Sequence, residues 1–207
     1  MENNLDYYLI HPVWNISEEL KAKLDGIVYA IEAAGERVHY PIRDVDQDDP
    51  IGLRICSEHR AAMQKARKVI MWYDPTSHGS MFDAGMGFMA GKPLEILNSE
   101  SIENITNDYE QFLIDYALQG FSDNHHLKPS SVYLDMRGKR DIIRAAKSLS
   151  YHWVTKDWEA LFDFGMIFMA GKPFTLLNRE EVEAQVEERK SYQKVLITLD
   201  DMYRGKK

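Results

Sequence analysis

The sequence predicts an α/β fold in which a mainly parallel sheet carries helices on both faces, giving three layers. Short apolar stretches alternate with stretches of helical periodicity, and the connections between them are short, which is typical of parallel sheets. Residues 68–73, KVIMWY, are almost continuously apolar, as expected of a strand buried on both faces. Glycine, proline and helix-capping residues separate the stretches.

The first half contains four predicted strands. The first is residues 6–11, which are aromatic and apolar and end before a proline. A helix capped by Ser17 and ended near Gly35 follows, with Leu20, Leu24, Val28 and Ile31 on one face. The remaining strands are 37–41, 68–73 and 93–97.

A polar, acidic loop, RDVDQDDP, separates the second strand from the next helix. Asp49 and Pro50 predict the start of that helix, because proline is favoured at the first helical position. Four of its residues are expected to face the core: Ile51, Ile55, Met63 and Ala66.

The second half has a weaker pattern. Residues 100–118 are predicted helical and 119–130 a loop. The rest of the half is predicted as strand at 132–136, helix at 141–149, strand at 149–154, strand at 174–177 and a charged helix thereafter. The stretch VLITL near the end suits either strand or helix.

The chain contains an internal repeat, in which Phe82 of the first copy corresponds to Phe162 of the second. FDAGMGFMAGKPLEILNSE, starting at Phe82, aligns without a gap on FDFGMIFMAGKPFTLLNRE, starting at Phe162, and thirteen of the nineteen positions are identical. Before this stretch the match fades, and the second copy has no counterpart of the first strand. We predict one intact unit, residues 1–105, and a truncated copy, residues 106–207, packed on it as one globule.

Much of the shared motif is explained by packing. Gly85 and Gly165 are expected to let each helix approach a strand closely, and Gly91 is expected to end the first helix. Phe82, Met86 and Met89 recur at helical spacing and are predicted core residues.

The two copies differ at the head of the motif. Ser77, His78, Gly79 and Ser80 become Asp157, Trp158, Glu159 and Ala160. Small residues at a strand-to-helix turn expose backbone N–H groups and the positive helix end, which suits a phosphate, carboxylate or hydroxyl group. Bulk and negative charge there would block such a ligand. The first copy is therefore predicted to hold the site, and the second to have lost it.

Asp83 allows two interpretations. It is either the central carboxylate of a site or, at capping-box spacing from Ser80, a residue that only satisfies N–H groups of the helix, which is worth about 0.5–2 kcal/mol. Its counterpart Asp163 persists where the serine is gone, which slightly weakens the second interpretation.

Composition excludes several classes of function. The formal charge is −8 with both signs interspersed, which argues against binding a nucleic acid polymer. The single cysteine, Cys56, cannot form an intrachain disulfide and favours a cytoplasmic setting. No signal peptide or membrane-spanning stretch is evident. The glycine-rich loops of common NAD and ATP sites are missing, so we predict no cofactor.

Three pieces of the chain resemble the nucleoside 2-deoxyribosyltransferase superfamily, which includes nucleotide N-glycosidases. They are YYLIHPV, KVIMWYDP and GSMFDAGMGFMAGKP, which together span roughly residues 6–98. The acidic loop and the SxGSxFDxGM pattern are most similar to an unassigned bacterial and phage subgroup. The resemblance implies a flavodoxin-like sheet of five strands and chemistry at the N-glycosidic bond of a nucleoside or nucleotide. It also implies self-association, in which a neighbour completes each site, so a homodimer remains possible.

The resemblance implies roles for individual residues. Asp83 stands where the family has a glutamate that attacks C1′, after which a second base or water takes the sugar. Tyr8 would position this carboxylate, Asp74 would handle the base, and the turn with Ser77, Gly79 and Ser80 would hold a sugar hydroxyl or a 5′-phosphate. Asp83 is one methylene shorter than glutamate, and the family's second carboxylate falls near residues 58–60, where the sequence reads Glu-His-Arg.

Ligands of open α/β sheets bind at the carboxyl ends of the strands, where His11 and the acidic loop are expected. Arg43, Asp44 and Asp46 are therefore further candidates for substrate binding. The aspartates alternatively suggest Mg²⁺ or Ca²⁺, but a turn glycine and a downstream glutamate at calcium-loop spacing are missing, so we predict no metal. Three functions stay open: an N-glycosidase or deoxyribosyltransferase, a non-catalytic nucleotide-binding or sensing protein, and a structural module, which the intact turn disfavours.

Overall fold

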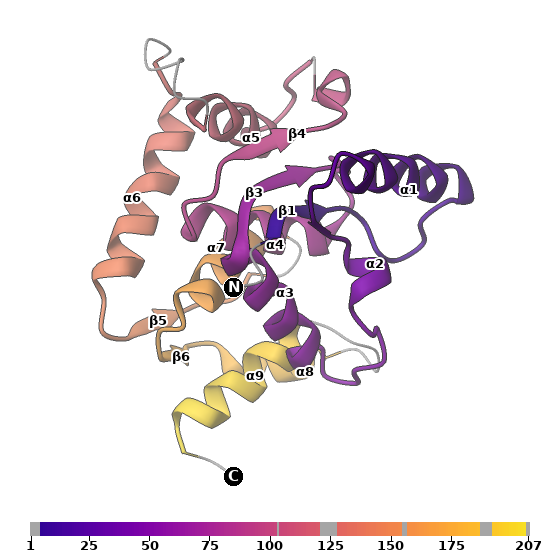
Figure 1. Cartoon of the computed structure of the whole chain (residues 1–207). Coiled ribbons are helices and arrows are strands. Elements are labelled where there is room, and N and C mark those ends of the chain that lie inside the picture. The colour runs from indigo at the N-terminus through magenta and orange to yellow at the C-terminus, as the bar shows by residue number, and fades with distance from the viewer. Residues whose placement is uncertain (1–4, 103, 121–127, 155–156, 187–191, 206–207) are drawn as a thin grey trace.

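A computed structural model shows the α/β fold that the sequence predicts (Figure 1). It describes residues 5–102, 104–120, 128–154, 157–186 and 192–205. The first sheet has the order β2-β1-β3-β4 and is parallel throughout. Its strands are β1 Leu5–Ile10, β2 Val38–His39, β3 Ala66–Met71 and β4 Leu94–Ile96. β3 lies inside the sheet with Val69, Ile70 and Met71 buried, as its apolar sequence predicts. Within the described residues this sheet has four strands, not the five implied by the resemblance.

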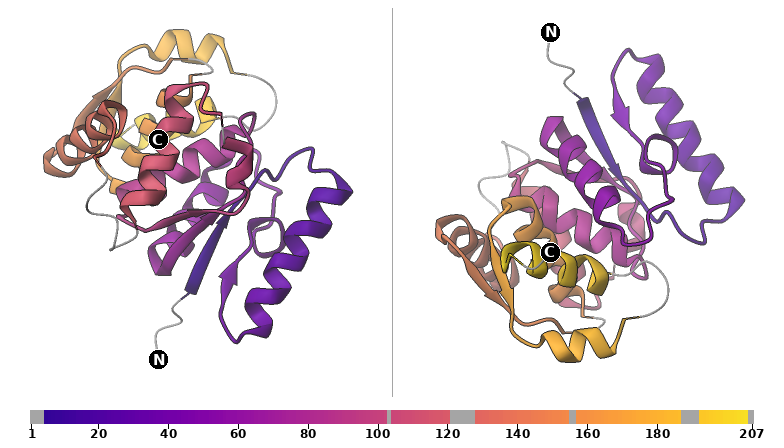
Figure 2. Two further views of the ribbon diagram at one scale, coloured as in Figure 1. Left: turned by 90° about the horizontal axis from the view of Figure 1, so that it is seen from above. Right: turned by 90° about the horizontal axis from the view of Figure 1, so that it is seen from below.

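Helices cover both faces of this sheet (Figure 2). α1, Glu18–Ala33, packs Leu24 and Val28 against Leu9 and Ile70 on one face. α3, Leu53–Lys65, and α4, His78–Met89, pack on the opposite face in a larger cluster of buried side chains. α5, Asp108–Gln119, joins that cluster beside β4. The helix α1 begins at its predicted cap, because the Ser17 side chain accepts from the Leu20 N–H.

The second half repeats one part of the first, the succession α3-β3-α4-β4. It contains α6 Ser131–Ala145, β5 Leu149–Tyr151, α7 Trp158–Ala170, β6 Phe174–Leu176, α8 Arg179–Ala184 and α9 Tyr192–Tyr203. β5 and β6 pair in parallel, and the alignment of the two copies places them on β3 and β4. Asn98 makes two side-chain hydrogen bonds with the backbone of Tyr73, at 2.7 and 2.9 Å. Asn178 makes the same two with Trp153, at 2.9 and 2.8 Å. The shared sequence therefore encodes a shared strand ending.

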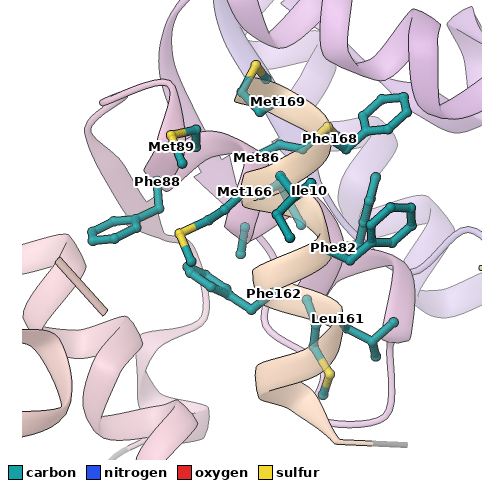
Figure 3. Close-up of a cluster of buried hydrophobic side chains, with 14 of the residues drawn as sticks. Ile10, Phe82, Met86, Phe88, Met89, Leu161, Phe162, Met166, Phe168 and Met169 are labelled. Carbon is teal, nitrogen blue, oxygen red and sulfur yellow. The ribbon is translucent and has the colours of Figure 1, made fainter. Parts of the chain in front are cut away.

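The two halves pack through α4 and α7, which cross at their glycines. A Cβ atom on Gly85 would lie 2.1 Å from the carbonyl oxygen of Phe162, and one on Gly165 would lie 2.1 Å from that of Phe82. Figure 3 shows the resulting cluster, in which Phe82 and Met86 of one helix meet side chains of the other. The glycines permit helix–helix contact, so the expectation that they allow a helix to approach a strand is wrong.

Equivalent arginines repeat this relationship at the rim of the crossing. The guanidinium of Arg60 lies 5.8 Å from the Phe168 ring, and that of Arg140, its counterpart in the second copy, lies 4.4 Å from the Phe88 ring. Each half thus places its arginine on the other half's phenylalanine. Reciprocal contacts between equivalent residues are typical of an interface with two-fold symmetry, and here both sides of the interface belong to one chain.

Several predicted boundaries are wrong for identifiable reasons. Residues 132–136 are helical, because Ser130 caps α6 and Tyr133, Met136 and Ile143 are buried at helical spacing. The helical spacing of these buried residues outweighs the strand propensity of valine and tyrosine in the same segment. VLITL is likewise helical, inside α9. The predicted helix 100–118 is broken into a 3-10 turn, Ser99–Ile102, and α5. Most of the predicted loop 119–130 lies outside the described residues.

The acidic loop also differs from expectation. A short helix, α2, Pro41–Asp44, occupies its start. Asp49 does serve α3, because its carboxylate accepts from the N–H groups of Arg54 and Ile55, but the helix begins at Leu53 and Pro50 precedes it. Ile51 is 41% exposed and does not face the core, and Ala66 is buried in β3 rather than in the helix.

Candidate functional site

A cavity of about 980 Å³ lies at the carboxyl edge of the first sheet. The N-terminal caps of three helices line it: Ser17 of α1, Gly52 of α3 and Ser77 of α4. Each helix N-terminus presents unpaired N–H groups and a partial positive charge. The described residues that line the cavity include no lysine or arginine, so these helix ends are its main source of positive potential.

Asp83 lies at the wall of this cavity and is held from two sides. Its Oδ2 accepts a hydrogen bond of 2.8 Å from the Tyr8 hydroxyl and lies 3.3 Å from Nδ1 of His59. Asp83 is 7% exposed, and Tyr8 beneath it is fully buried. Burial and the neighbouring carboxylate hold the pKa of Tyr8 well above its ordinary value, so this hydroxyl keeps its proton and donates.

Asp83 does not cap its helix. The cap of α4 is Ser77, whose Oγ accepts from the Ser80 N–H at 3.3 Å, and Asp83 lies in the second turn. The capping-box interpretation of Ser80 and Asp83 is therefore wrong, because the helix begins earlier than that spacing requires. The carboxylate is instead directed at two polar side chains from β1 and α3.

Three histidines surround the Asp83–Tyr8 pair. His59 lines the cavity, His39 stacks on Tyr8 with ring centroids 5.2 Å apart, and His11 lines the cavity from the end of β1. Burial lowers the pKa of His39 to about 4 and also lowers that of His11. The Nε2 atoms of all three are buried without a hydrogen-bond partner among the described residues. Unsatisfied nitrogens at one site are unusual, and a ligand group or water would satisfy them.

Four residues at the turn before α4 were predicted to contact the ligand, and the structure places three of them at the cavity. Asp74, Ser77 and Gly79 line the cavity. Asp74 accepts from the backbone and hydroxyl of Thr76, at 2.8 and 2.7 Å, which fixes the turn. Ser80 is buried, bonds to Ser77 Oγ at 2.8 Å and does not line the cavity, so it supports the turn from behind.

Three residues predicted to bind substrate lie apart from the cavity lining. Arg43 pairs with Glu32 and Asp44, at 2.8 and 2.6 Å. Asp44 accepts from the Tyr40 N–H at the start of α2, and Asp46 accepts from the Asp48 N–H. These side chains stabilise the acidic loop, whose member Gln47 does line the cavity.

The second half of the chain contributes part of the wall. Trp153, Leu161 and Tyr192 line the same cavity as Asp83. The Tyr192 hydroxyl lies 3.6 Å from where a Cβ on Gly79 would be, and its ring packs on Phe82 with centroids 4.9 Å apart. Figure 1 shows α9, which carries Tyr192, beside α3. The sequence suggested that the second copy could supply the surface of a neighbour that completes the site, but it did not identify these residues. The sequence also showed no sign of His39. It pointed to His59 only as one of residues 58–60, where the family's second carboxylate falls.

The corresponding place in the second half differs. A smaller cavity of about 470 Å³ is lined there by Trp158 and Asp157 together with Tyr73 and Met81 of the first half and Tyr109 of α5. The Trp158 ring packs 5.0 Å from that of Tyr109. Trp158 thus lies at the start of α7, whereas the Glu159 carboxylate lies 3.0 Å from Nζ of Lys139.

Asp163, the counterpart of Asp83, is absent from this lining. Lys139 Nζ lies 3.2 Å from its Oδ2. Burial raises the pKa of Asp163 to about 6, although Lys139 acts in the opposite direction. The carboxylate is retained, but it faces a lysine and not a ligand cavity.

The described part of the chain contains no group of three or more His, Cys, Asp or Glu side chains arranged to hold a metal ion. None of its helices is long and apolar enough to cross a membrane. The arrangement can hold a small ligand with hydroxyl or anionic groups at the helix ends and a reacting carbon near the Asp83 carboxylate.

Comparison of the chain with protein-family models, curated proteins and solved structures finds no match.

Proposed function

We propose that the protein cleaves or transfers at the N-glycosidic bond of a nucleoside, deoxynucleoside or nucleotide. The observation that carries this proposal is the Asp83 carboxylate, which lines a large cavity and is fixed by the Tyr8 hydroxyl at 2.8 Å. A fixed, partly desolvated carboxylate suits attack on an acetal carbon, because it divides one hard displacement into two easier ones. The resemblance of the first half to the nucleoside 2-deoxyribosyltransferase superfamily supports the same chemistry.

In this proposal Asp83 attacks C1′ of the sugar, the C1′–N bond breaks and the base leaves. A glycosyl ester of Asp83 then reacts with water or with a second base. Tyr8 keeps its proton and holds one carboxylate oxygen, so it orients the nucleophile without competing for the sugar. Desolvation at the cavity wall strengthens these electrostatic interactions.

The cavity lining also fits the polar groups of such a substrate. Ser77 and Gly79 at the start of α4 offer a hydroxyl and backbone N–H groups to a sugar hydroxyl or 5′-phosphate. Trp14, which is 62% exposed, lies at the cavity and presents an aromatic ring on which a base can stack. Because Trp153 and Tyr192 of the second half complete the wall, one chain supplies both parts of the site, and we propose that self-association is not required.

A second candidate is a protein of the same fold that binds nucleotides without cleaving them. It is favoured by the short Asp83 side chain, both of whose oxygens already face protein donors, at 2.8 Å for Tyr8 and 3.5 Å for His59. A carboxylate held in this way could serve only to bind a sugar hydroxyl.

Incubation of the purified protein with a panel of ribo- and deoxyribonucleosides and their 5′-monophosphates, followed by chromatography, separates the two candidates. The proposal expects free base from at least one member, with or without an acceptor base. Binding by calorimetry without base release would favour the second candidate. If the protein neither binds nor cleaves any member of the panel, both candidates are contradicted.

A further inference from the structure

We propose, on the basis of the function proposed above, that His59 is the proton-transfer residue of the Asp83 site. Its Nδ1 lies 3.3 Å from Oδ2 and 3.5 Å from Oδ1 of Asp83, so this nitrogen donates to the carboxylate. The opposite ring nitrogen, Nε2, is buried and has no hydrogen-bond partner among the described residues, although the side chain lines the cavity. A carboxylate that orients an imidazole through Nδ1 leaves Nε2 to exchange a proton with a substrate.

The repeat supports this assignment. The register that aligns Phe82 with Phe162 also places Lys139 on His59 and Asp163 on Asp83. Lys139 Nζ lies 3.2 Å from the Asp163 carboxylate, so each half pairs this aspartate with a nitrogen-bearing side chain from the preceding helix. The half with the large cavity has a histidine, the side chain that serves most often as a general acid or base, and the other half has a lysine. If charge pairing alone were needed, lysine would serve in both.

The proton transfers balance in both steps. As the Asp83 oxygen bonds to C1′ and the C1′–N bond breaks, Nε2–H of His59 donates its proton to the departing base nitrogen. In the second step water bonds to C1′, the ester bond to Asp83 breaks and Nε2 takes the proton released by water. Water is the only co-reactant. The titratable groups near the His59 ring are Asp83, His39 at 6.2 Å between ring centroids, Tyr8 at 6.0 Å and His11.

The test replaces His59 by the residue that the repeat supplies. His59→Lys retains a positive partner for Asp83, and His59→Gln retains a hydrogen-bond donor, but neither can transfer a proton in the same way. Lys139→His is the matched control in the other half. Circular dichroism and thermal melts check folding of all three. Two substrates are used: the best nucleoside of the panel, and a nitrophenyl deoxyriboside, whose leaving group departs as an anion without protonation.

We expect both His59 variants to lose roughly 100- to 10,000-fold in kcat on the nucleoside, the usual contribution of a general acid or base. On the nitrophenyl substrate they should still release a rapid burst of nitrophenol, about one per site, followed by slow turnover, because only the second step then needs His59. Lys139→His should resemble the wild type. If His59→Lys cleaves the nucleoside within threefold of wild type, His59 only pairs charge and the inference is wrong while the proposed function stands. Failure of the wild type to cleave either substrate overturns both.

Discussion

The backbone of Gly165 touches that of Phe82, since a Cβ atom on this glycine would lie 2.1 Å from the Phe82 carbonyl oxygen. Gly85 has the same relationship with Phe162. These reciprocal contacts bring α4 and α7 together at a distance that side chains would prevent. The repeated glycine is therefore a requirement of packing between the two halves. Trp153 and Tyr192 of the second half line the Asp83 cavity of the first.

Gly85→Ala and Gly165→Ala should each destabilise the protein by about 1–3 kcal/mol or more, because the added methyl group meets backbone atoms that cannot move aside. Urea denaturation followed by circular dichroism measures this change. Gly26→Ala and Gly138→Ala are matched controls, since both glycines lie within helices and have open space where a Cβ atom would be added. They should stabilise the protein by up to about 1 kcal/mol. Equal effects at all four positions would show that the helix crossing is not tight.

Asp163→Asn should stabilise the protein at neutral pH. Burial raises the pKa of Asp163 to about 6, above its ordinary value of 3.8, so the folded state holds this proton more tightly than the unfolded state. Stability contributed by the protonated form is present below pH 4 and is lost as the pH rises through 6. Asparagine removes that loss of stability, which is at most about 3 kcal/mol.

Urea denaturation of wild type and Asp163→Asn at pH 4 and pH 7.5 tests this sign. The difference between the two proteins should be small at pH 4 and favour the variant at pH 7.5. A variant that is less stable than wild type at pH 7.5 would mean that the ion pair with Lys139 outweighs burial of the carboxylate.

Gly79→Trp should abolish nucleotide binding and leave the fold intact. Among the described residues, only the Tyr192 hydroxyl, at 3.6 Å, lies near a Cβ on Gly79, so the backbone tolerates a side chain while the indole enters the cavity. This substitution imitates the bulk that Trp158 brings to the second half. Gly138→Trp, on an open helix surface, controls for the added aromatic ring. Calorimetric titration with the panel nucleotide measures the effect. Unchanged affinity in Gly79→Trp, with wild-type thermal stability, would place the ligand elsewhere.

The sequence predicted the first sheet well because its strands are short, apolar and separated by clear capping residues. β3 shows this most plainly, since a continuously apolar stretch between turn residues has few alternatives to a buried central strand. The second half was harder. Residues 132–136 have strand-like composition, but Ser130 and burial at helical spacing place them in α6. Local propensity was overridden there by packing against the other half.

Only some residues of the candidate site could be predicted from the sequence, because the others are brought to it by long-range packing. Ser77 and Gly79 were predicted because they differ from Asp157 and Glu159 in the second copy, whereas Asp83, which both copies share as aspartate, was predicted from the resemblance. Arg43, Asp44 and Asp46 were expected at the ligand because they follow a strand. Arg43 instead pairs with Asp44, and the two aspartates accept from the N–H groups of Tyr40 and Asp48. Trp153 and Tyr192 line the cavity but lie 70 or more residues after Asp83 in the chain, so no local pattern reveals them. Alignment of His59 with Lys139 in the repeat is the signal that would have drawn attention to His59.

The central claim is that Asp83 is the nucleophile of an N-glycosidic reaction, and base release by Asp83→Asn tests it most directly. Asparagine keeps the size of the side chain and an acceptor for Tyr8 but removes the charge. Asp163→Asn, the same change in the other half, is the control. With the cleaved member of the panel, Asp83→Asn should release base several orders of magnitude more slowly than wild type while remaining folded, and Asp163→Asn should match wild type. If Asp83→Asn releases base at the wild-type rate, the carboxylate is not the nucleophile and the account is contradicted.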